Sequence, residues 1–268
     1  IKKLTAYEHS IFYYGSKDKD EVATILDKHH QIPLELLPVI PPHKFVQVPT
    51  DKNKVVFVNF KGMVQAEILM ISKGASDFNS QENIISHLYN DYFGAGLASV
   101  VFQEIRESRA LAYSTYVYNA SPDKKDKAHY LRAFVGTQAD KMKEAIDAIV
   151  EIIDDIPISD DQILNTAESI VKKIETERIT GSDVYWDRRS NALRGIDNDI
   201  RAEIYQQYKE ITSSKELAVK ALKDFHSETI KGRKFVFLVL GDKENLDMKY
   251  LNTLGTFQEL TLEQVFGY

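Results

Sequence analysis

Residues Phe93 to Tyr118 read FGAGLASVVFQEIRESRALAYSTYVY, and this stretch says more about the fold than any other part of the chain. Gly94 and Gly96 open an apolar helix that ends among charged residues, and an aromatic, β-branched strand follows at once. Such a helix-to-strand corner can hold a cation and a phenol at a fixed separation. Arg106 and Tyr113, seven residues apart, are therefore our candidate functional pair.

The composition is typical of a globular protein with a packed core. The chain has 268 residues, of which 43% are hydrophobic and 28% charged. Its formal net charge is -6 and it has no long basic block, so it would repel nucleic acid. Apolar runs such as Phe235 to Leu240 are far shorter than the roughly 20 residues of a membrane helix. We expect a soluble protein without a membrane span or a nucleic-acid partner; the compartment is unknown.

The first 42 residues read differently from the rest. Ile11 to Tyr14 is a strand candidate closed by Gly15, and Asp20 to Lys28 has apolar residues on one helical face. Residues 31–42, QIPLELLPVIPP, are rich in proline, which removes hydrogen-bond donors and favours extended backbone. This segment is predicted to be a linker. Because the chain starts with Ile1 rather than Met, we expect the gene product to begin elsewhere.

An internal comparison suggests how the chain is organised. SIFYYGSKDKDEVATIL near the start and VFLVLGDKENLDMKYLNTL near the end share a strand, a glycine, charged residues and a helix, with Gly15 and Gly241 226 residues apart. We therefore predict that residues 1–30 are the tail of a preceding homologous module, 31–42 a proline-rich linker, and 43–268 one complete module. The alternative is two unrelated strand–glycine–helix turns, since a glycine between a strand and a helix is common.

Alternating strand and helix patterns fill the predicted module. The expected strands are His43 to Val48, Lys54 to Phe60, Ala66 to Ser72, Ala112 to Asn119, Tyr130 to Val135 and Lys234 to Leu240. The expected helices are one that starts at Asn79 with Glu82 and ends at Gly94, Leu97 to Arg109, Asp140 to Asp155, one capped by Ser159 with Gln162, Ile200 to Ile211, and one capped by Ser213 with Glu216. This order predicts an α+β fold: a largely antiparallel sheet with helices packed on one face.

The common signatures of catalytic sites do not occur in this sequence. The chain has no cysteine, and its seven histidines form neither HExxH nor HxxEH. The nearest approach is Thr5 to His9, TAYEH, which would need a histidine in place of Thr5. Phosphate-binding loops and nucleophile elbows are also absent. We therefore predict no metal site and no catalytic residue within this sequence.

Arg106 has no acidic neighbour at helical spacing. The residues three and four positions away are Phe102, Gln103, Arg109 and Ala110. We therefore expect its charge to be free for another partner. In the alternative interpretation, Arg106 and Arg109 only complement the helix dipole and Tyr113 packs at the start of the strand.

The segment FGAGLASVVFQEIRESRALAYS is similar to the signature of the non-catalytic domains in the pitrilysin and insulin-degrading enzyme family of zinc peptidases, which includes mitochondrial processing peptidase. The similarity is strongest over Asp91 to Tyr118, and the element order from His43 to Gly241 agrees with the family pattern. Members of the family often have a further glycine where Ala95 stands, a difference that we expect to alter the turn little.

The resemblance implies two or four homologous modules whose two halves enclose a chamber. In the family, zinc is held in the first module by HxxEH and a distant glutamate, while a later module supplies an arginine and a tyrosine that contact the substrate backbone. These positions correspond to Arg106 and Tyr113; the zinc ligands and the general base have no counterpart here. The resemblance thus implies an inactive, substrate-binding domain whose partners are a peptide and a zinc-bearing N-terminal half or partner subunit.

Other functions stay open. Some family relatives have lost proteolysis and act as structural subunits, so this chain could be a scaffold, and an unrelated peptide-binding α+β domain is a third possibility. Whether the parent protein is an active peptidase is therefore uncertain. A weaker hypothesis is that strands Val55 to Phe60 and Ala66 to Ser72 pair with an extended substrate by edge addition.

Overall fold

The computed structural model describes residues 4–41 and 46–267, which divide into two compact units. The first unit is formed by Ile1–Val46 with Arg178–Arg189, and the second by Gln47–Glu177 with Ser190–Tyr268. Within the described residues, no helix has both the length and the apolar character needed to cross a bilayer.

The first unit is small and mostly exposed. It contains a short 3-10 helix, η1 (Leu4–Ala6), the helix α1 (Lys19–His29), and the first part of α5 (Gly181–Leu193). The strand expected at Ile11 to Tyr14 is wrong: these residues are not in a strand, because no strand among the described residues pairs with them to complete their backbone hydrogen bonds. Among the described residues of the proline-rich segment, none lies in a helix or strand.

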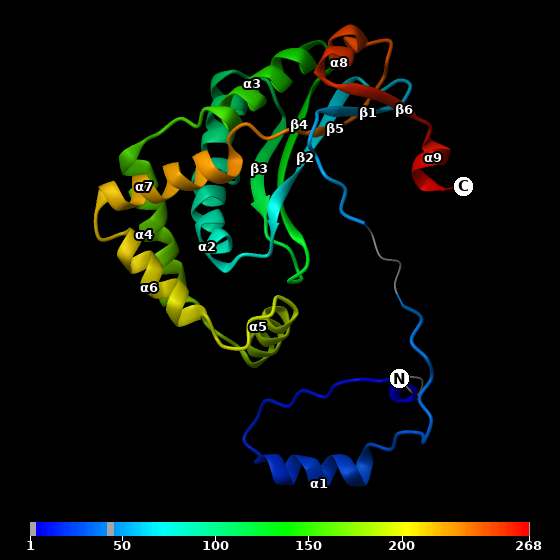
Figure 1. Cartoon of the computed structure of the whole chain (residues 1–268), viewed down its shortest axis with the longest axis vertical. Helices are drawn as coiled ribbons and strands as arrows, with labels where there is room; N and C mark the ends of the chain where they lie inside the picture. Colours follow the sequence, from blue (N-terminus) through cyan, green and yellow to red (C-terminus); the bar gives the residue numbers. More distant parts are fainter. Residues whose placement is uncertain (1–3, 42–45, 268) are drawn as a thin grey trace. The chain divides into compact units, whose positions relative to one another are not determined.

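The second unit is built on a six-stranded sheet with the order β3-β4-β2-β5-β1-β6 (Figure 1). The strands are β1 (Lys54–Asn59), β2 (Gln65–Asp77), β3 (Ser114–Ala120), β4 (Ala128–Gln138), β5 (Val236–Gly241) and β6 (Thr256–Leu260). The pairs β3–β4, β4–β2 and β2–β5 are antiparallel, whereas β1 is parallel to both β5 and β6. The predicted α+β fold with a largely antiparallel sheet is thus confirmed.

Two details of the strand prediction are wrong. Residues 43–45 of the expected first strand lie outside the described residues, and Val46 to Val48 are not in a strand. The sixth strand is instead β6, TFQEL, which sequence analysis did not identify. Its polar composition gives a weak strand pattern, as suits an edge strand that is largely exposed.

Helices cover one face of the sheet (Figure 1). The helices of the second unit include α2 (Ser80–Tyr89), the π-helix η2 (Asn90–Gly94), the π-helix η3 (Phe102–Ser108), η4 (Ala139–Lys141), α3 (Met142–Asp154), α4 (Asp160–Thr176), α6 (Arg201–Ile211), α7 (Lys215–Phe225), η5 (His226–Ile230) and α8 (Met248–Leu254). The short helix α9 (Leu262–Phe266) follows β6 and has no buried residue. Along β4, Leu131, Ala133 and Val135 are buried, while the residues between them are not. This period of two identifies the face that packs against the helices.

The predicted helix caps are only partly confirmed. Asn79 caps α2 by accepting a hydrogen bond from the Glu82 amide at 3.0 Å. Ser159 occupies the N-cap of α4, but its side chain makes no capping hydrogen bond. For α7 the cap is Ser214, not Ser213; its hydroxyl accepts from the Leu217 amide at 3.2 Å.

The hypothesis of substrate addition to Val55–Phe60 or Ala66–Ser72 is wrong. The first range belongs to β1, which lies between β5 and β6, and the second to β2, which lies between β4 and β5. Interior strands have both backbone edges paired, so they cannot accept a further strand. The sheet edges are β3 and β6.

Gly94 allows the end of η2 to lie directly on β3. A Cβ atom at this position would be 1.4 Å from the Val117 carbonyl oxygen, a distance at which the backbone would have to move. Gly96 has a φ of +94°, in the region that favours glycine. Ala95 between them is extended, with φ -139° and ψ 145°, so any residue fits there. The glycine-to-alanine difference from the family pattern therefore leaves the turn intact.

His129 is a fully buried histidine beside α2. The Glu82 carboxylate lies 3.5 Å from its Nδ1 atom, and the Asn79 amide donates to its Nε2 atom at 3.4 Å. Burial lowers the pKa of His129 below its ordinary value; the negative charge of Glu82 opposes this effect, while Arg233 and Arg194 add to it.

We predict that Gly94→Ala lowers the free energy of unfolding by about 3 kcal/mol or more, because the added methyl group meets backbone rather than a movable side chain. The matched control is Gly136→Ala in β4, where the nearest atoms would be 3.5 Å away on the Phe134 ring. Chemical denaturation of both variants checks the prediction. Equal losses in the two would show that the close approach at Gly94 is unimportant.

We predict that stability falls as the pH drops below about 6.5, the ordinary histidine pKa. Because the folded-state pKa of His129 is lowered, the unfolded chain binds more protons in this range, and protonation favours unfolding. Above that pH the contribution is fully present. The free energy of unfolding, measured between pH 7 and pH 5, should depend less on pH in His129→Asn. An unchanged slope in this variant would contradict the assignment.

Candidate functional site

The helix that carries Arg106 begins in a tightly bonded turn. The Ser99 hydroxyl donates to the Gly96 carbonyl at 2.8 Å and accepts from the Phe102 amide at 3.3 Å. The Gln162 side chain of α4 donates to the Ala98 carbonyl at 2.8 Å. These contacts hold the start of the helix against the helical layer.

The π-helix η3 presents Arg106 to solvent. Val101 and Ile105 are fully buried, whereas the Arg106 side chain is 45% exposed. The Arg109 amide donates to the Glu104 carbonyl at 3.2 Å, which is the five-residue spacing of a π-helix. Short π-helical segments occur frequently at functional sites.

The chain turns from η3 into β3 through an unusual backbone conformation. Ala110 has a φ of +49°, a backbone angle that residues other than glycine rarely adopt. Leu111 is buried next to it, and its amide donates to the Ile105 carbonyl at 2.9 Å. The Tyr113 amide then donates to the Gly136 carbonyl at 2.8 Å, which starts the pairing with β4.

This turn brings Arg106 and Tyr113 to the same pocket, as the helix-to-strand corner predicts. The pocket has a volume of about 250 Å³ and is lined by Arg106, Glu107, Ala110, Leu111, Ala112, Tyr113, Gln138 and Lys141. Tyr113 is 54% exposed. Both side chains are thus accessible from a concave surface.

The expectation that the Arg106 charge is free is wrong. Its Nε atom lies 3.6 Å from a carboxylate oxygen of Glu107, the next residue in the chain. Helical spacing did not reveal this pair because the flexible arginine stem reaches an adjacent side chain. Both partners are about half exposed, so the ion pair is weak and easily exchanged. Arg106 also lies over the Phe102 ring, 4.8 Å from its centroid.

Arg109 differs from Arg106 in its surroundings. Its guanidinium donates to the Glu151 carboxylate of α3 at 3.2 Å, which ties the end of η3 to the helical layer. Among the described residues, Arg106 by contrast contacts Phe102 and Glu107 of its own helix. Arg109 therefore has a structural partner, whereas Arg106 faces the pocket.

Gln138 and Lys141 complete the pocket, and sequence analysis did not identify either. The Gln138 amide donates to the Tyr113 hydroxyl oxygen at 2.9 Å, which leaves the phenolic proton for another acceptor. Lys141 donates to the Ala110 carbonyl at 3.3 Å. Gln138 is the last residue of β4, and Lys141 lies just after it in η4. No local sequence pattern links either residue to Tyr113.

Metal ligands are not gathered in the part of the chain that the structure describes. No group of three or more histidine, aspartate or glutamate side chains among these residues could hold a metal ion. The side chains present therefore do not fit a zinc site, and no step of a reaction is assigned to a metal bound by this chain.

A family model described as "Peptidase M16 inactive domain" matches residues 10–171, which is more than half of the chain. No curated protein matches the sequence.

Three similar solved structures illustrate the fold. A peptidase M16 inactive domain from Pseudomonas fluorescens is 15% identical, with a TM-score of 0.62 over 85% of this chain and 52% of that one. The periplasmic protease PqqL from Escherichia coli is 15% identical, with a TM-score of 0.60 over 85% of this chain and 25% of that one. A chain of complex III from Candida albicans is 16% identical, with a TM-score of 0.54 over 91% of this chain and 57% of that one.

At these identities the structural likeness establishes the fold alone. The chain spans about half the length of the Pseudomonas fluorescens protein and a quarter of PqqL. Activity, substrates and partners of the parent protein are therefore separate questions from the fold.

The conformation of Ala110 yields a prediction about stability. Because glycine adopts positive φ without a steric penalty, we expect Ala110→Gly to raise the free energy of unfolding by up to about 1 kcal/mol. Ala112→Gly, where φ is negative, should lower it by about 1 kcal/mol. Denaturant titration distinguishes the two; a loss of stability in Ala110→Gly as large as in the control would disprove the backbone argument.

Proposed function

The chain belongs to the family of peptidase M16 inactive domains, and we propose that it is a substrate-binding, chamber-forming part of a zinc metallopeptidase. In this proposal, zinc and the general base come from another part of the same protein or from a partner subunit. A peptide is the substrate, and this chain alone is inactive.

The observation that carries the proposal is the shared pocket of Arg106 and Tyr113. A pair sealed in the hydrophobic core could not reach a substrate, but both side chains are exposed on one concave surface. Their pocket is lined by donors, including the Gln138 amide and the Lys141 ammonium. Donors suit a peptide backbone, whose carbonyl oxygens are strong acceptors.

Arg106 would hold a substrate carbonyl through its fork of N–H donors. The ion pair with Glu107 is worth little at this exposure, so exchanging it for a substrate oxygen costs little. The Phe102 ring keeps the guanidinium in place while this exchange occurs.

Tyr113 would donate its phenolic proton to the carbonyl oxygen on which negative charge develops. A donor that is already positioned stabilises that charge more than water does, because it needs no reorganisation. The hydrogen bond from Gln138 fixes the phenol and polarises its O–H bond. Activation of the attacking water belongs to a zinc site outside this chain.

We also propose the module boundaries read from the sequence: a tail of a preceding module at residues 1–30, a linker at 31–42 and a complete module at 43–268. The flanking gene sequence tests this division. A homologous module whose sequence ends within residues 1–30 would support it.

A second candidate is a structural subunit without proteolytic activity. The likeness to a chain of complex III from Candida albicans favours it, because the same fold occurs there within a large assembly. An HxxEH motif upstream in the same polypeptide, or in an adjacent reading frame, would favour the peptidase. Its absence would favour the scaffold.

We predict that Tyr113→Phe lowers peptidase turnover of the complete protein about a hundred- to a thousandfold, as loss of an oxyanion donor does. Arg106→Ala should lower turnover about tenfold or more, as loss of a charged hydrogen bond does. Zinc content should be unchanged in both. The measurements are steady-state cleavage of a fluorogenic peptide and metal analysis of the purified proteins.

Arg109→Ala is the matched control, because Arg109 ends the same helix but pairs with Glu151. Its turnover should stay close to that of the unchanged protein. Full activity in Arg106→Ala and Tyr113→Phe would refute the proposed roles.

A further inference from the structure

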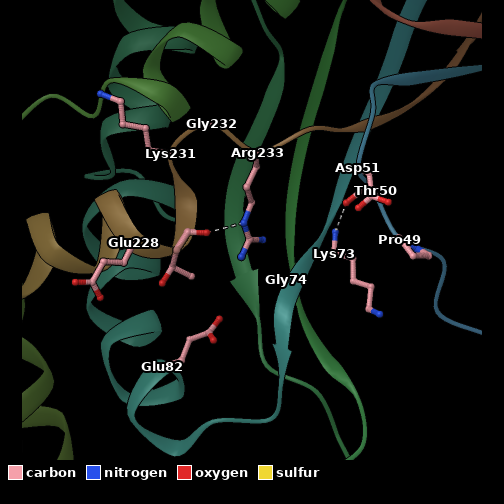
Figure 2. A pocket seen from close by; sticks show the side chains of 11 residues that line it. Pro49, Thr50, Asp51, Lys73, Gly74, Glu82, Glu228, Lys231, Gly232 and Arg233 are labelled. Carbon is pink, nitrogen blue, oxygen red and sulfur yellow. Dashed lines mark hydrogen bonds between the residues drawn. The ribbon is translucent and has the colours of Figure 1, made fainter.

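A second cavity lies at the other end of β2, away from Arg106 and Tyr113. Its volume is about 510 Å³, and its walls are the loop at 49–51, the strand end at 73–74, the start of α2 and the turn at 228–233 (Figure 2). Gln138 of the first pocket pairs with Gln65, eight residues before Lys73. At about 3.3 Å per residue, the two sites are roughly 26 Å apart.

The walls of this cavity are held in place by hydrogen bonds from several elements. The Lys73 amide donates to the Thr50 hydroxyl at 2.9 Å (Figure 2), and the Gly232 amide donates to the Asp154 carboxylate at the end of α3 at 2.8 Å. Gly74 packs so closely that a Cβ atom there would be 2.9 Å from the His129 carbonyl oxygen. The cavity is thus held by fixed backbone contacts at the protein surface and is formed before any ligand arrives.

Arg233 is the cation at the centre of this cavity. Its Nε atom donates to the Thr229 carbonyl at 2.6 Å (Figure 2), and its Nη1 atom makes a long contact of 3.4 Å with the Ser72 carbonyl. Nη2 lies beside Gly74, where the missing side chain leaves room. Among the described residues, Arg233 makes its hydrogen bonds through Nε and Nη1, and Nη2 makes none. Several N–H groups of this half-buried guanidinium are therefore without a hydrogen-bond partner among the described residues.

A carboxylate is the chemical complement of this arrangement. Guanidinium and carboxylate groups form two parallel charge-assisted hydrogen bonds, and such pairs are stronger where water is partly excluded. Figure 2 shows the ends of Lys73 and Lys231 directed away from the Arg233 guanidinium, so one cation faces the ligand space. This favours a single carboxylate over a ligand with several negative charges.

The acidic residues of the lining indicate that the ligand also carries a positive charge. Three cations, Lys73, Lys231 and Arg233, are balanced by three acids, Asp51, Glu82 and Glu228. The Glu82 carboxylate points toward the same space as Arg233 in Figure 2, and a carboxylate can accept several hydrogen bonds at once. A neutral lining with both signs of charge matches a ligand that also carries both.

We propose that this cavity binds a short peptide with free termini, its α-carboxylate on Arg233 and its ammonium group toward the acidic side of the lining. A volume of about 510 Å³ accommodates a dipeptide, within the usual range of small-molecule sites. The site is separate from Arg106 and Tyr113, and the inference does not depend on the proposed peptidase function.

The test is an NMR titration of the ¹⁵N-labelled chain with dialanine, followed at the amides of Gly74 and Gly232. Dialanine should produce saturable shifts at both. Dialanine amide, which lacks the carboxylate, should bind about tenfold or more weakly, and N-acetyldialanine should bind several-fold more weakly. Inorganic phosphate should compete poorly.

Arg233→Lys keeps the charge but loses the fork of donors, so dialanine should bind it about tenfold more weakly. Arg109→Ala, which removes an arginine outside this cavity, should bind dialanine as the unchanged chain does. If Arg233→Lys does not fold, the ligand series decides the question, because it needs no variant. Absent shifts, equal binding of the amide or acetylated forms, equal binding by phosphate, or unchanged affinity in folded Arg233→Lys would each overturn the proposal.

Discussion

The contact between Gly94 and the Val117 carbonyl oxygen is the constraint on which the candidate site depends. With no side chain at position 94, the end of η2 rests on the backbone of β3. On the other side of the same strand, β4 pairs with it through the antiparallel register that sets Ser114 opposite Gly136. The strand is thus held between a helix end and the sheet, which fixes where Tyr113 enters it.

The corner between η3 and β3 then holds two hydrogen-bond donors, Arg106 and Tyr113, at the surface next to this packed region. Ile105 and Leu111 anchor the corner in the core, and the positive φ of Ala110 turns the chain between them. Arg109 contacts α3 through Glu151, so its charge has a partner outside the helix. Among the described residues, Arg106 makes a weak, exposed ion pair with its neighbour Glu107 and lies over the Phe102 ring. A group that contacts the substrate needs a backbone that fixes its position and a side-chain contact that the substrate can replace. Arg106 has both.

Much of the fold was predictable because its signals are local. The apolar periods of β1, β2 and the helices, and the glycines at 94 and 96, identified the α+β class and the corner. Elements that depend on distant partners were predicted less well. Ile11 to Tyr14 is apolar like a strand, but no described strand pairs with it. By contrast, β6 is stabilised by pairing with β1 rather than by its own polar sequence.

The site shows the same division between local and distant information. Arg106 and Tyr113 were found because they lie in one continuous segment, whereas Gln138 reaches Tyr113 from a strand 25 residues further along the chain. The ion pair between Arg106 and Glu107 was missed because the rule for side-chain pairs on a helix compares residues three and four positions apart, whereas these two are adjacent. Arg233 and Gly74 meet only through the folding of β2 against the turn after η5, and no sequence pattern links them.

The most direct test of the central claim is photocrosslinking from position 113. Benzoylphenylalanine is placed at Tyr113 in the complete protein, a labelled peptide is added after zinc has been removed by chelation so that the peptide stays intact, and the adduct is mapped by mass spectrometry. Leu217, exposed on the helical layer at α7, serves as the matched control position. The account predicts a peptide adduct at position 113 and little or none at 217. Equal labelling at both positions, or none at 113 under conditions in which the peptide binds, would contradict it.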